Sequence, residues 1–184
     1  MLFFAVFVDG PQESQKYGRK GFSIEMRLDG DPHYVGVISD THGLLRPAAE
    51  KALKGVELII HAGDVGSAEV LKALNRIAPV AAVRGNMDRG DWAQKLPVQE
   101  IVKIGESLVY VIHDVHEIDL NPAVAGFRAV ISGHSHRPSV VEQKGVLYLN
   151  PGSAGPRRFK LPVSLAVLTV NGQQLEVKLV ELER

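Results

Sequence analysis

The sequence predicts an α/β protein in which a parallel βαβ half is followed by a half built mainly of β-hairpins. In the first half, short apolar runs rich in β-branched residues alternate with amphipathic helical segments, the pattern of parallel βαβ units. In the second half, apolar segments come in pairs separated by turn residues, which is typical of antiparallel hairpins. The chain has 184 residues, enough for one such domain with its own core.

The βαβ half is expected from residue 34 onward. A helix opens at Pro47, because proline is favoured at the first helical positions. A second helix covers 67–77, where apolar residues fall on one face. The strands of this half are the apolar runs 34–39, 58–63 and 80–85.

The hairpin half begins near residue 100. A short apolar run at 129–132 predicts a further strand. Turn residues stand between the later pairs, at Lys144-Gly145 and at Asn171-Gly172. The paired segments are 100–104 with 107–113, 139–143 with 146–150, and 164–170 with 174–180.

Residues 1–33 form an N-terminal extension, and the domain itself is placed at 34–184. Apolar and polar residues alternate over 22–28, which predicts a strand. The extension is interpreted either as a hairpin or as a flexible tail, and a start codon placed too far upstream would also produce such a tail. The same alternation would add a strand to a second copy, so a homo-oligomer is among the expected partners.

Composition excludes several function classes. The chain has 21 Lys and Arg against 21 Asp and Glu, and this neutral balance argues against long nucleic acid as a partner. The absence of cysteine excludes a disulfide scaffold, a thiolate metal site and a cysteine nucleophile. The apolar opening run has only eight residues and no preceding positive charge, so neither a membrane span nor a secretory signal is expected. We expect a cytoplasmic protein without a membrane partner.

Metal-binding side chains follow the predicted strands, at the edge where ligands collect in open α/β sheets. Each short motif alone is a weak signal, but their ordered combination is a strong one. Carboxylate, imidazole and a single amide oxygen suit borderline divalent metals such as Mn, Fe, Zn or Ni. Seven ligands are too many for one tetrahedral ion, and they suffice for two ions that share a carboxylate. The set is Asp40, His42, Asp64, Asn86, His113, His134 and His136.

The ordered motifs resemble those of the calcineurin-like metallophosphoesterase superfamily. The closing NPGS (150–153) and the short length resemble its small bacterial and archaeal phosphodiesterase subgroup. The resemblance covers about residues 35 to 182 and implies an αββα sandwich, two facing mixed sheets flanked by helices. The motifs that carry it are VISDTHG (37–43), HAGDVG (61–66), VRGNMD (83–88), VIHD (111–114) and ISGHSH (131–136).

The resemblance implies a two-metal phosphodiesterase that attacks a small or nucleotide-like diester with a metal-bridging hydroxide. Asp64 would bridge the ions, and Asn86 would both bind metal and touch the substrate, which makes these two the expected catalytic residues. Manganese is the first expectation, with Fe, Ni or Zn as alternatives. The first metal would take Asp40, His42 and His136, and the second would take Asn86, His113 and His134.

A non-catalytic interaction module of the same fold is the alternative function. Filled ligand positions favour the enzyme. Met87 stands where many family members have a histidine that protonates the leaving group, so leaving-group protonation is expected to be weak. Asp114 replaces a frequent glycine and would either orient a metal-binding imidazole or crowd the substrate side. Arg157 and Arg158 would clamp a substrate phosphate, or belong to a solvated loop.

Overall fold

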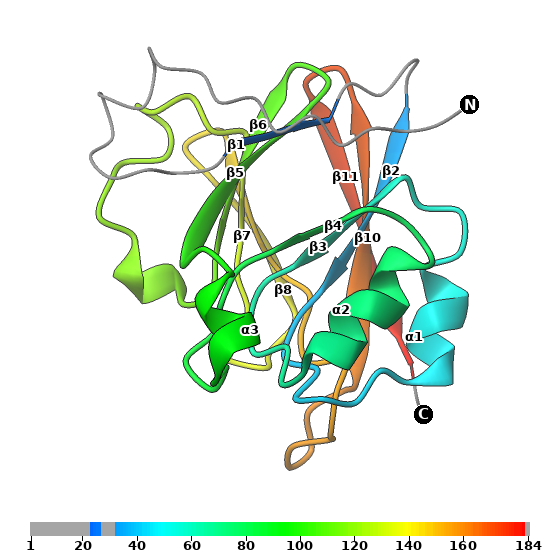
Figure 1. The fold of residues 1–184 in the computed structure, drawn as a ribbon. Helices are drawn as coiled ribbons and strands as arrows, with labels where there is room; N and C mark the ends of the chain where they lie inside the picture. The colour runs from blue at the N-terminus through cyan, green and yellow to red at the C-terminus, as the bar shows by residue number, and fades with distance from the viewer. Residues whose placement is uncertain (1–22, 27–31, 183–184) are drawn as a thin grey trace.

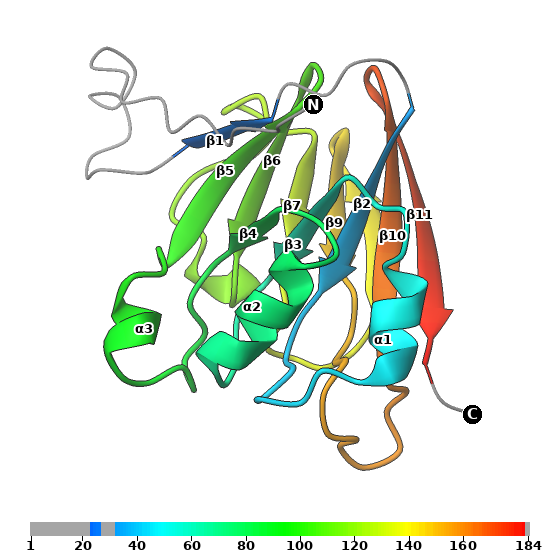
Figure 2. The ribbon, with the colours of Figure 1, turned by 45° about the vertical axis from the view of Figure 1, so that its right-hand side comes forward.

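Two facing β-sheets form the centre of the protein in the computed structural model, which describes residues 23–26 and 32–182 (Figures 1 and 2). One sheet has six strands in the order β1-β5-β6-β7-β9-β8, and the other has five in the order β11-β10-β2-β3-β4. The strands are β1 (Ser23–Met26), β2 (His33–Ile38), β3 (Leu58–His61), β4 (Val80–Ala82), β5 (Gln99–Ile104), β6 (Ser107–Ile112), β7 (Ala129–Ile131), β8 (Ser139–Gln143), β9 (Val146–Asn150), β10 (Ser164–Asn171) and β11 (Gln174–Glu181).

The predicted βαβ half is confirmed. Strands β2, β3 and β4 pair in parallel. Helix α1 (Pro47–Ala52) opens at the predicted proline, and α2 (Ala68–Asn75) lies within the predicted second helix. A short helix α3 (Asp91–Gln94) follows β4.

The three predicted hairpins are present as β5-β6, β8-β9 and β10-β11, each antiparallel. Strand β10 also pairs antiparallel with β2, which joins the last hairpin to the βαβ sheet. The strand predicted at 129–132 is β7, and it lies parallel to both β6 and β9. Both sheets are therefore mixed.

The part of the N-terminal extension that the structure describes is β1. It pairs in parallel with β5, from Ser23 opposite Ile101 to Met26 opposite Ile104. Strand β2 already begins at His33, one residue before the expected start of the domain. Residues 1–22 and 27–31 lie outside the described residues, so the choice between hairpin and tail stays a prediction.

Three apolar clusters hold the layers together. The largest lies between the sheets and includes Val37, Ile60, Val102 and Leu168. A second joins α1 and α2 to the outer face of the five-stranded sheet. The third covers the other outer face around Tyr110, where the described chain contributes loops and the 3-10 helix η1 (Val115–Glu117). The two-sheet sandwich is confirmed, with one helical layer much thicker than the other.

The carboxyl ends of β2, β3, β6 and β7 lie at the lower edge of the sandwich in Figure 2. Loops that follow these strands therefore meet there, although they come from both sheets. Within the described part of the chain, no helix is long and apolar enough to cross a membrane.

Candidate metal centre

The predicted ligands lie in loops that directly follow strands, and most of them have an unusual backbone. Five of the seven have φ between 46° and 65°, in the left-handed region that side chains other than glycine rarely adopt. Such strain persists only where the surroundings fix it, and it concentrates at functional sites. These five are Asp40, His42, Asp64, His134 and His136.

One group of candidate ligands consists of Asp40, His42 and His136, with ligand atoms all within 4.8 Å of one another. Nε2 of His136 lies 3.2 Å from Oδ1 of Asp40, and Nε2 of His42 lies 4.0 Å from the same oxygen. Oδ1 of Asp40 and Nε2 of His42 are buried, and neither makes a hydrogen bond to the described residues. Buried polar atoms without partners are costly, so these atoms are candidates for binding a cation.

Around Asp64 a second group of candidate ligands lies beside the first. Nε2 of His113 is 3.4 Å from Oδ2 of Asp64 and 3.0 Å from Oδ1 of Asn86. Nδ1 of His134 is 3.2 Å from the same Asn86 oxygen. Oδ2 of Asp64 also lies 4.0 Å from Nε2 of His42, so this carboxylate stands between the two groups.

Each central aspartate uses one carboxylate oxygen for the scaffold and turns the other toward the histidines. Oδ2 of Asp40 accepts hydrogen bonds from the Ser39 hydroxyl at 2.6 Å and from the backbone N–H of His134 at 3.2 Å. Oδ1 of Asp64 accepts the backbone N–H of Met87 at 2.7 Å. The free oxygen of each carboxylate is thus aimed at the imidazoles by protein contacts alone.

Burial and contacts between the site residues shift the pKa values of three of them. Burial would raise the pKa of Asp64, but hydrogen bonds from His113 and the Met87 backbone hold it below its usual range. Burial lowers the pKa of His42, although Asp64 and Asp40 oppose this. Burial would lower the pKa of His113, but contacts of Nε2 with Asp64 and of Nδ1 with the Ala62 carbonyl raise it above its usual value. In the neutral form, an N–H at Nδ1 would donate to the carbonyl and Nε2 would be the nitrogen able to bind a metal.

Two glycines beside the site leave no room for any side chain. A Cβ on Gly85 would collide with the Asp64 carboxylate and backbone. A Cβ on Gly133 would collide with the Ser39 hydroxyl and come within 2.8 Å of Oδ2 of Asp40. The glycines that precede Asn86 and His134 are therefore needed for the loops to approach the aspartates.

The comparisons with known proteins agree with this geometry. Residues 34–173 match the calcineurin-like phosphoesterase superfamily domain. The chain belongs to this superfamily.

Its relatives in the superfamily include archaeal proteins of similar length. A protein of Methanocaldococcus jannaschii named "Probable metallophosphoesterase" is 37% identical over 167 residues, 84% of each chain. A protein of the same name from Methanothermobacter thermautotrophicus is 35% identical over 158 residues, 79% of this chain and 91% of its own.

Solved structures give the same fold. A structure described as a novel archaeal phosphodiesterase has a TM-score of 0.67 at 25% identity and covers 80% of this chain and 99% of its own. Vps29 of Chaetomium thermophilum has a TM-score of 0.66 at 21% identity and covers 81% of this chain and 96% of its own. The superfamily fold predicted from the motifs is thus confirmed.

A pocket of about 260 Å³ opens beside the second group of ligands. Asn86, His113 and His134 are among its lining residues. The rest of the lining is Arg84, Gly85, Val98, Asp114 and Glu117. Within this pocket Oδ2 of Asp114 lies 3.7 Å from Nε2 of His134, so the carboxylate faces the imidazole nitrogen that points away from Asn86. The contact with His134 fits the orienting role and the place in the pocket lining fits the crowding role, so both stay predictions.

Arg157 and Arg158 are exposed on a loop whose start packs against the loop of Asp40. Their predicted contact with substrate stays a prediction.

Several supporting residues were missed by the sequence interpretation. Both carboxylate oxygens of Asp88 accept backbone N–H groups, from Gly66 at 2.8 Å and Gly85 at 2.9 Å. Asn150 donates to the Gly133 carbonyl at 2.6 Å, and Ser153 donates to the Asp40 carbonyl at 3.0 Å. The NPGS motif carried a signal for the last two, but no pattern indicated which loops they hold.

Proposed function

We propose that this protein is a two-metal phosphodiesterase that hydrolyses a small or nucleotide-like diester. The observation that carries the proposal is the pair of adjacent ligand groups, in which Asp64 stands between His42 and His113. Membership of the phosphoesterase superfamily supports phosphoester hydrolysis. Likeness to an archaeal phosphodiesterase supports a diester substrate.

The seven predicted residues fit two divalent transition-metal ions. Asp40, His42 and His136 would hold one, Asn86, His113 and His134 the other, and Asp64 would serve both. Manganese remains the first expectation, with Fe, Ni or Zn as alternatives, because oxygen and imidazole donors suit all four. Such ions supply Lewis acidity and lower the pKa of a water toward neutrality.

The chain's own residues would position the phosphoryl group. Asn86 is exposed at the pocket wall, and its Oδ1 faces His113 and His134. Its amide N–H groups are therefore available to donate to a phosphoryl oxygen. Arg157 and Arg158 would pair with further substrate charge, since guanidinium groups match phosphate oxygens.

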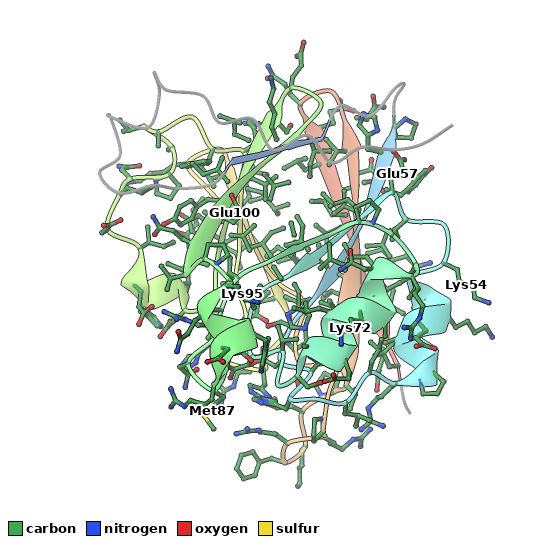
Figure 3. All side chains as sticks on the ribbon, viewed as in Figure 1. Lys54, Glu57, Lys72, Met87, Lys95 and Glu100 are labelled. Atoms are coloured by element: carbon green, nitrogen blue, oxygen red, sulfur yellow. The ribbon has the colours of Figure 1, made fainter. Side chains whose placement is uncertain are left out.

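Protonation of the leaving group is the weak step of this site. Met87 is 54% exposed and cannot donate a proton (Figure 3). Asp88 is buried with both oxygens already engaged by backbone N–H groups, so it holds loops together and is not placed as an acid. A substrate with a good leaving group is therefore favoured.

The test is hydrolysis of bis(p-nitrophenyl) phosphate and p-nitrophenyl phosphate by protein reconstituted with Mn²⁺. The diester should be the better substrate, and Asp64→Asn should lower kcat/KM by more than about a hundredfold, because even outer-shell changes cost about 10–100-fold. Asp119→Asn is the matched control, since Asp119 is exposed outside the site. Equal turnover by Asp64→Asn and wild type would remove the assigned centre and favour the interaction module.

A further inference from the structure

Loop 156–160 is the most unusual exposed segment near the candidate centre. It has the sequence PRRFK, so three cations surround one aromatic residue, and all five residues are exposed. The ring of Phe159 is the extreme case, because Phe159 is 92% exposed. Both faces of the ring are therefore accessible, and a planar group could stack on it.

The start of this loop is attached to the centre itself. The Ala154 backbone N–H donates to the Ser39 carbonyl at 3.0 Å, and Arg46 donates from Nε to the Gly155 carbonyl at 3.1 Å. A Cβ on Gly155 would collide with the backbone oxygens of Asp40 and Thr41, so the chain passes directly over the first ligand loop. In Figures 1 and 2 the loop then projects beyond the lower edge of the sandwich, the edge where the site lies.

The backbone of the loop is built to present the ring. Phe159 has φ 53°, a left-handed conformation that is an outlier for a bulky residue. The Leu161 backbone N–H donates to the Arg158 carbonyl at 3.1 Å and closes a turn around the phenylalanine. Strain of this kind is held at ligand clamps, and here it turns an aromatic face to solvent.

Charge differs between the two sides of the centre. The loop side carries Arg157, Arg158 and Lys160, whereas the pocket side carries the carboxylates of Asp114 and Glu117 with a single Arg84. Because Gly155 lies directly against the backbone of Asp40 and Thr41, these charges lie on the side of the first ligand group. A further negative charge on a substrate is therefore drawn to the loop.

We propose that loop 156–160 binds one arm of the phosphodiester substrate, and that this arm carries an aromatic ring and a further negative charge, as in a nucleoside diphosphate. The ring stacks on Phe159, and the charge pairs with Arg158. This proposal rests on the proposed function, since it assigns the substrate class of the same site. It makes Phe159 a specificity-determining residue.

The test is calorimetric titration of Mn²⁺-loaded protein with ribose 5-phosphate, AMP and ADP. AMP should bind about 5- to 150-fold more tightly than ribose 5-phosphate, the range expected for stacking of one base. Phe159→Ala should abolish this difference and Phe159→Tyr should retain it. Arg158→Gln should abolish the additional preference for ADP over AMP. Val124→Ala is the matched control, because Val124 is 84% exposed on a loop outside the site and its truncation should change nothing.

Two results would overturn the inference: equal binding of AMP and ribose 5-phosphate by wild type, or an unchanged difference in Phe159→Ala. Hydrolysis of bis(p-nitrophenyl) phosphate by the same preparation separates this failure from failure of the proposed function. If the protein hydrolyses the diester but binds AMP and ribose 5-phosphate equally, the proposed function stands and the specificity proposed for Phe159 is wrong. Exposure of Phe159 means that its removal should leave the melting temperature unchanged, so misfolding will not imitate the result.

Discussion

Glu100 predicts a specific dependence of stability on pH. It lies on β5 on the same face as Val102 and Ile104, which belong to the core between the sheets, and it is 4% exposed (Figure 3). Burial raises the pKa of its carboxyl from 4.5 to about 7, although the Ile101 backbone N–H donates to Oε1 at 3.0 Å and opposes the shift. The folded protein therefore holds this proton more tightly than the unfolded chain does.

The magnitude follows from the difference between the two states. Well below pH 4.5 the carboxyl is neutral in both states and stability does not depend on its titration. As the pH rises to about 7 the unfolded state gains from ionisation first, so stability is lost. A difference of about 2.5 pH units corresponds to about 3 kcal/mol in total. About 2.5 kcal/mol of this falls between pH 5 and pH 8.5.

Replacement of Glu100 by glutamine removes the titrating carboxyl group and keeps the shape of the side chain. Urea unfolding of Glu100→Gln and wild type, followed by circular dichroism at about pH 5 and pH 8.5, measures the effect. The free energy of unfolding of the variant, relative to wild type, should rise by about 2.5 kcal/mol between these two pH values. Glu106→Gln is the control, because Glu106 is exposed at the turn after β5. A variant whose difference from wild type is the same at both pH values would refute the reasoning.

Four further outcomes are expected. Asp114→Asn should weaken Mn²⁺ binding by about tenfold in calorimetry, through loss of the carboxylate that faces His134, and unchanged affinity would remove this role. Gly85→Ala should abolish strong Mn²⁺ binding, because its Cβ meets the Asp64 carboxylate, and a variant that binds normally would contradict the packing. Leu149→Ala should cost about 2–5 kcal/mol in urea unfolding, since Leu149 is 1% exposed between the sheets, and a loss under about 1 kcal/mol would be unexpected. Mn²⁺ at about 100 times its Kd should stabilise wild type by about 2.7 kcal/mol, seen as a higher melting temperature that EDTA reverses.

The sequence predicted those parts of the fold that depend on local pattern. Alternating apolar residues and turn signals such as Asn171-Gly172 predicted the β10-β11 hairpin and the other hairpins. These local patterns did not predict that β10 would pair with β2, or that β1 would pair in parallel with β5. These pairings join segments that are far apart in the chain. The residues of a strand do not indicate which distant strand it will pair with.

The candidate site shows the same division. The candidate ligands were found because each follows its strand within a short motif, and the fold brings such strand ends together. Their supports were not found, because Ser39, Asp88 and Asn150 act on loops distant in sequence. The left-handed backbone at the histidine and aspartate ligands was also not predicted, because glycine is the residue type that indicates this conformation in a sequence.

The backbone of the centre is fixed by the protein rather than left for a metal to impose. The loop of Asp40 is bonded to the loop of Asp64 through three backbone contacts of 2.8 to 3.0 Å, from the N–H groups of residues 40, 42 and 43 to the carbonyls of residues 63, 64 and 65. Asp88 and Ser153 stabilise these and the adjoining loops through hydrogen bonds to their backbone. Left-handed residues cost free energy that these contacts must offset before any ligand arrives. In a centre held in this way the ligand residues are already in position, so metal binding does not have to order them. Selectivity among metal ions then depends on the chemistry and spacing of the donor atoms.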